Sequence, residues 1–126
     1  MAQRFAPATP KFPHMLHGGD YNPEQWLDQP EVLEEDIRLF RKAHINCVSL
    51  GIFSWAKLEP EEGVFTFDFW DEFLELCKQE EMHVIFGTPT ATPPAWLTEK
   101  YPEVLNCRQD GVPYRHGARR HYNYNS

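Results

Sequence analysis

A regular alternation of short apolar stretches with amphipathic ones constrains the fold of this chain most. The apolar stretches, at 15–20, 46–51 and 83–87, have the length of strands. Between them, residues 30–44 and 68–77 repeat apolar side chains at three- and four-residue steps, which is the period of a helix. Because parallel strands need a crossover of about a dozen residues, usually a helix, this order predicts a β-α-β-α-β run.

The two predicted helices each have one apolar face. In the first helix, which begins near Pro30, acidic residues crowd the first half and basic residues the last, an order that suits the helix dipole. Asp68 is the predicted N-cap of the second helix. The third strand is nearly all apolar, as expected for a parallel strand that is covered on both faces. The apolar face of the first helix carries Leu33, Ile37, Phe40 and Ala43, and the predicted buried face of the second carries Trp70, Phe73, Leu74 and Cys77.

The glycine pattern after the first strand separates two kinds of parallel fold. An open nucleotide-binding sheet would carry G-x-G-x-x-G there, whereas this chain has Gly18-Gly19-Asp20-Tyr21. The pattern therefore favours a (β/α)₈ barrel, which needs about 250 residues. The 126 residues supply about three βα units. We therefore predict an α/β chain that forms the incomplete N-terminal portion of a TIM barrel, with an arm at 1–12 and the barrel portion at 13–126.

Composition excludes several classes of function. The formal net charge is −7, which disfavours nucleic acid as a partner. No apolar run approaches the roughly 20 residues of a membrane span, and the N-terminus lacks the apolar region of a signal peptide. The three cysteines are widely spaced and odd in number, which predicts reduced thiols in a cytoplasmic protein.

Polar and aromatic residues follow each predicted strand, where the active site of a βα barrel lies. Asp20 and Tyr21 follow the first strand, Phe53 and Trp55 the second, and residues 88–96 the third. Acidic and hydroxyl groups can bind sugar hydroxyls, and aromatic faces can pack against the apolar face of a sugar ring. We therefore expect Asp20, Tyr21, Phe53 and Trp55 to line a pocket for a polyhydroxylated ring.

Five segments, in order, resemble the β-galactosidases of glycoside hydrolase family 42. They are HGGDYNPEQW at 17–26, FSW at 53–55 with LEPEEG at 58–63, TPTATPPAWL at 88–97, YPE at 101–103, and GARRHY at 117–122. The resemblance implies a retaining glycosidase with two glutamates, an acid/base and a nucleophile. Both are expected beyond the end of this chain, so the chain alone is expected to be inactive. Glu24, Glu59 and Glu103 are not assigned to these roles, and a structural role is favoured for Glu59.

The resemblance also bears on one substrate contact, on metal binding and on the oligomeric state. It implies that Arg119, the first arginine of the Arg-Arg-His-Tyr run, contacts the sugar; by spacing alone it would be a solvated charge. Some family members place a zinc-ligating cysteine where this chain has Asn123, and Cys107 does not match the site, so we expect neither zinc nor another cofactor. The expected partner is a small β-galactoside, and the resemblance suggests a homotrimer. The alternative is a non-catalytic sugar-binding or interaction protein on a partial βα scaffold.

Overall fold

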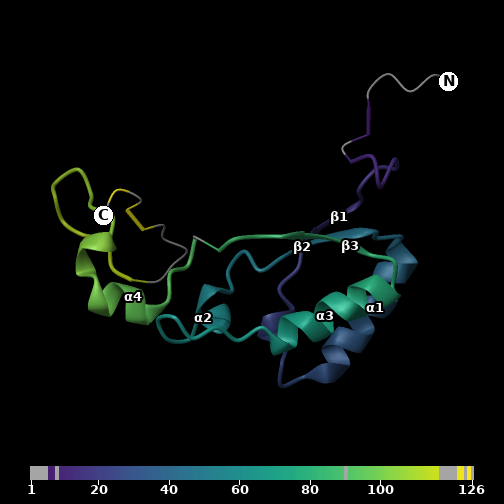
Figure 1. Ribbon diagram of the computed structural model, residues 1–126, viewed down its shortest axis with the longest axis horizontal. Helices are drawn as coiled ribbons and strands as arrows, with labels where there is room; N and C mark the ends of the chain where they lie inside the picture. The colour runs from purple at the N-terminus through teal and green to yellow at the C-terminus, as the bar shows by residue number, and fades with distance from the viewer. Residues whose placement is uncertain (1–5, 8, 90, 117–121, 124, 126) are drawn as a thin grey trace.

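The structure is a computed structural model that describes residues 6–7, 9–89, 91–116, 122–123 and 125. Its helices and strands follow the predicted alternation, with short helical turns added between them (Figure 1). In chain order they are β1 (Gly18–Asp20), η1 (Pro23–Gln25), α1 (Pro30–Ala43), β2 (Cys47–Leu50), α2 (Trp55–Leu58), α3 (Asp68–Gln79), β3 (His83–Phe86), α4 (Ala95–Lys100) and η2 (Pro102–Val104).

The three strands form a parallel sheet in the order β1-β2-β3. In this register Gly18 is opposite Cys47, and Cys47 is opposite His83. Figure 1 shows α1 and α3 on the same side of the sheet, while α2 and α4 lie beyond the end at which β2 and β3 finish. The predicted β-α-β-α-β run is therefore confirmed, and the loops after the strands gather at one edge.

The helix ends follow from local sequence in α1 but not in α3. Pro30 opens α1, and His44 closes it in the left-handed conformation at φ 56°, where its N–H donates to the carbonyls of Phe40 and Arg41. The predicted N-cap of α3 was wrong by one residue. Phe67 holds the cap position and Asp68 is the first helical residue, with no side-chain cap hydrogen bond at this end. Asp68 therefore interacts with the dipole of the first turn instead of capping it.

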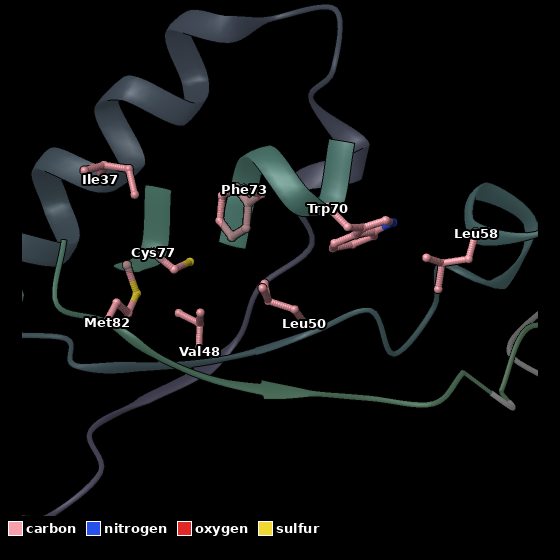
Figure 2. Close-up of a cluster of buried hydrophobic side chains, with 8 residues drawn as sticks. All are labelled: Ile37, Val48, Leu50, Leu58, Trp70, Phe73, Cys77 and Met82. Carbon is pink, nitrogen blue, oxygen red and sulfur yellow. The ribbon is translucent and has the colours of Figure 1, made fainter. Parts of the chain in front are cut away.

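The hydrophobic core fills the space between the sheet and the two long helices (Figure 2). Leu50 is fully buried, and Trp70 and Phe73 are each 2% exposed. Burying one large apolar side chain stabilises a fold by about 1.5–3 kcal/mol, so each large member of this layer contributes to the stability of the segment. The buried members are Ile37, Val48, Leu50, Leu58, Trp70, Phe73, Cys77 and Met82.

No helix of the described part of the chain covers the opposite face of the sheet. Ile85 is 54% exposed there, opposite Ser49, and His83 is exposed at the start of the same strand. The expectation that β3 is covered on both faces is therefore not met by these residues. The arm reaches this strand, because the ring of Phe12 lies 4.0 Å from that of His83, centroid to centroid. The arm boundary at residue 12 stays a prediction.

No helix in the described ranges combines the length and the apolar character that crossing a bilayer requires.

Candidate active site

Strand alternation decides which predicted site residues can meet. Val48 and Leu50 point from β2 into the core beneath the helices (Figure 2). Ser49, between them, therefore faces the uncovered side of the sheet. Asp20 is opposite Ser49 in the register and shares that side, where its residue is exposed. Asp20 thus stands at the end of β1, on the face that a barrel would enclose.

Tyr21 lies on the other side of the sheet. Its hydroxyl donates to Asp36 of α1 at 2.8 Å, and its ring packs edge-on against Phe40. Burial, and then the hydrogen bond to the Asp36 carboxylate, raise the pKa of the Tyr21 phenol well above its usual value. Tyr21 fastens the end of β1 to α1 and packs against the core, whereas Asp20 faces the opposite way.

Hydrogen bonds tie the loop after β2 to the two loops beside it. Ser54, 1% exposed, donates from Oγ to Oε1 of Glu24 in η1 at 2.8 Å. The carbonyl of Phe53 accepts a hydrogen bond from Oγ1 of Thr92 at 3.1 Å. The backbone at Phe53 therefore links the loop that follows β2 to the loop that follows β3. The second oxygen of Glu24, Oε2, is buried and has no hydrogen-bond partner within the part of the chain that is described.

An aromatic group surrounds Trp55 at the start of α2. The ring of Trp96 lies edge-on to it at 6.5 Å, and the ring of Tyr122 at 5.7 Å, measured between centroids. Each of the three rings is partly buried, so part of each is open to solvent. The aromatic group thus joins residues far apart in the sequence, at the edge of the sheet where the strands end.

Glu59 makes hydrogen bonds to both tryptophans of this group. Its Oε2 accepts the indole N–H of Trp55 at 2.7 Å, and its Oε1 accepts the backbone N–H of Gly63 at 2.9 Å. Its carbonyl oxygen accepts the indole N–H of Trp96 at 2.9 Å. Glu59 is therefore a hydrogen-bond acceptor inside the framework of the site, and its carboxylate is occupied by N–H donors.

Sequence reasoning missed several of these contacts. The contact between Trp55 and Glu59 could have been predicted from the sequence, because residues four apart on a helix are neighbours. Glu24 and Ser54 are 30 residues apart, and no local pattern connects them. An isolated antiparallel β-bridge between Leu105 and Tyr122 holds Tyr122 close to Trp55. Arg119, the predicted sugar contact, lies outside the described residues, as does the neighbouring Arg120.

The described cysteines do not form a metal site. Cys47 in β2 and Cys77 in α3 are buried, and Cys107 is exposed in another part of the chain. Burial raises the pKa of the Cys77 thiol to about 11, so it is a poor source of thiolate at neutral pH. Among the described residues, no group of three or more His, Cys, Asp or Glu side chains could hold a metal ion. Asn123 donates from its backbone N–H to the carbonyl of Val104. The expectation that the protein works without zinc stays a prediction.

The fold and the edge residues define a class: the opening βα units of a parallel barrel, with acidic and aromatic side chains gathered where the strands end. Comparison with known proteins defines the family. A family model for the β-galactosidases of glycoside hydrolase family 42 matches residues 20–126. This chain belongs to that family.

Individual relatives agree with this result. Over 123 residues the chain is 51% identical to the β-galactosidase BglY of Alicyclobacillus acidocaldarius, covering 98% of this chain and 18% of the relative. It is 50% identical over 112 residues to the β-galactosidase GalA of Bacillus licheniformis, covering 89% and 17%.

Solved structures give the same answer for the fold. The β-galactosidase of Rahnella sp. R3 matches with a TM-score of 0.89 and 45% identity, over 95% of this chain and 18% of that one. Gan42B, a family 42 β-galactosidase from G. stearothermophilus, matches with a TM-score of 0.80 and 45% identity, over 85% and 16%. The chain thus spans less than a fifth of the length of these relatives, and the predicted TIM-barrel class is confirmed for the part that it spans.

Proposed function

We propose that the whole protein carrying this segment hydrolyses terminal β-D-galactosides. The observation that carries the proposal is the match of residues 20–126 to the β-galactosidase family, with relatives about half identical over nearly the whole chain. The edge of the sheet supports it chemically, because Asp20 offers a carboxylate to sugar hydroxyls and Trp55 and Trp96 offer apolar rings.

The family resemblance implies a retaining double displacement. One glutamate protonates the leaving oxygen and later activates water, while a second attacks the anomeric carbon and forms a glycosyl-enzyme. In such enzymes the two carboxyl groups are about 5–5.5 Å apart. We assign neither role to Glu24 or Glu59, whose carboxylates bind Ser54 and Trp55 respectively. These residues would instead shape the walls of the sugar site.

Location, assembly and metal content stay predictions. The family resemblance supports a cytoplasmic enzyme that assembles as a homotrimer. The absence of a matching cysteine at Asn123 supports activity without zinc. Neither nucleic acid nor a membrane is expected as a partner, in line with the net charge of −7.

A substrate panel tests the proposed activity. The whole protein, purified from a host without its own galactosidase, is expected to release nitrophenol from a nitrophenyl β-D-galactoside. Rates on the matching α-D-galactoside and β-D-glucoside are expected to be at least tenfold lower. The glucoside loses the hydrogen bonds to the one ring hydroxyl whose configuration differs, and the α-galactoside directs its leaving oxygen away from the acid/base glutamate. Binding of galactose without turnover would favour the non-catalytic alternative, and equal rates on all three glycosides would contradict the substrate assignment.

A further inference from the structure

Both oxygens of the Glu59 side chain face N–H donors. Oε2 accepts the indole N–H of Trp55, and Oε1 accepts the backbone N–H of Gly63, which turns the chain at φ 76°. An ionised carboxylate accepts with both oxygens, whereas a glutamine amide has one acceptor and one NH₂ group. Replacing Glu59 by Gln therefore sets an NH₂ group against one of these two N–H donors. The two N–H donors need a side chain with two acceptor oxygens at this position, and no other residue type of similar length has two.

The consequence of these bonds is a fixed orientation of two rings. The Trp55 side chain is held through Oε2 of Glu59, and Trp96 is held through the carbonyl oxygen of the same residue. The two rings consequently stand almost perpendicular, at 87°. Since both indole N–H groups are used within the protein, what the rings offer to a ligand is their apolar surface.

We propose that Glu59 is a positioning residue that fixes Trp55 and Trp96 as an aromatic wall for the apolar face of the sugar. The proposal rests on the proposed β-galactosidase function for the identity of the ligand. An aromatic wall contacts the sugar in both the bound substrate and the transition state, so losing its orientation weakens binding more than it slows chemistry. The role of Glu59 is therefore expected to appear in KM.

The kinetic test compares Glu59→Gln with Glu61→Gln in the whole protein. Glu61 is exposed in the same turn and its side chain makes no hydrogen bond to the described residues, so it is a matched control for the loss of one charge. Glu59→Gln is expected to raise KM for a nitrophenyl β-D-galactoside about tenfold while kcat stays within about threefold, and Glu61→Gln to leave both within twofold. In the double variant Trp55→Phe/Glu59→Gln, KM is expected to match that of Trp55→Phe alone, because Glu59 acts through the ring.

A second measurement does not depend on catalysis. The protein is labelled with 5-fluorotryptophan, and the ¹⁹F signal of Trp55 is assigned by its disappearance in Trp55→Phe. This signal is expected to shift or broaden in Glu59→Gln and to stay in place in Glu61→Gln. If the wild-type protein does not hydrolyse β-galactosides, the proposed function fails, and the fluorine signal still tests the positioning role.

Two results would overturn the positioning role. One is an unmoved Trp55 signal in folded Glu59→Gln. The other is a Glu59→Gln variant of an active enzyme that melts at a lower temperature with KM and kcat both unchanged, which is what a purely structural residue would give. If Glu59→Gln does not fold, Glu59→Asp takes its place: it keeps two acceptors on a shorter stem, and it is expected to shift the Trp55 signal and raise KM in the same direction.

Discussion

Gly18→Ala is expected to destabilise the protein by about 3 kcal/mol or more, at the upper end of the cost of inserting an atom into a packed region. A Cβ built on Gly18 would lie 1.6 Å from the carbonyl oxygen of Cys47 and 2.8 Å from its carbonyl carbon. Both are backbone atoms of the paired strand β2, so they cannot turn aside as a side chain could. The clash can be relieved only if β1 moves away from β2, which would disrupt the pairing that places Asp20 opposite Ser49.

Gly19→Ala is the matched control, because a Cβ at the next residue meets nothing within 4 Å. This change is expected to alter the free energy of unfolding by about 1 kcal/mol or less, in either direction. Urea denaturation of the two variants beside the wild type measures the difference. Equal stability of Gly18→Ala and Gly19→Ala would show that the close approach of β1 to β2 is not as the structure has it.

Arg119→Ala is expected to lower kcat/KM on a β-galactoside by about tenfold to a hundredfold, with little change in thermal stability. A charge-assisted hydrogen bond contributes about 1.5–3 kcal/mol, and 1.36 kcal/mol corresponds to tenfold in rate. The support for this prediction is the position of Arg119 in the Arg-Arg-His-Tyr run, together with the contact that Tyr122, three residues later, makes with Trp55. Arg119→Lys is expected to recover only part of the loss, because an ammonium group lacks the planar fork of a guanidinium.

Arg120→Ala controls for the register of this assignment. If Arg120→Ala loses activity and Arg119→Ala keeps it, the sugar contact is one residue further along the chain. If both variants keep a normal kcat/KM, the segment does not contact the substrate. The measurement is steady-state kinetics at several substrate concentrations, so that kcat and KM are separated, with a thermal melt of each variant.

Periodicity predicted the framework well, because burial imposes a regular spacing on it. The helical step of Leu33, Ile37 and Phe40 indicated the face of α1 that packs on the sheet, and Trp70 and Phe73 did the same for α3. These positions recur at the period of the element that carries them, so one sequence contains the information.

The candidate site was predicted less completely, because its geometry depends on contacts between distant segments. Asp20 and Tyr21 are neighbours at the end of a strand, which suggested that both line the same pocket. Successive residues of a strand, however, point to opposite faces of the sheet. Tyr21 consequently packs with Phe40 under the sheet. The hydrogen bond from Trp96 to Glu59 closes a gap of 37 residues, and only the folded chain reveals it.

The stereochemistry of the released sugar tests the central claim most directly. Proton NMR can follow the hydrolysis of a β-galactoside by the whole protein and record which anomer of galactose appears before mutarotation mixes the two. A member of this family that works by double displacement is expected to release the β-anomer first, because two inversions at the anomeric carbon retain its configuration. Release of the α-anomer first, or no release of galactose at all, would contradict the account.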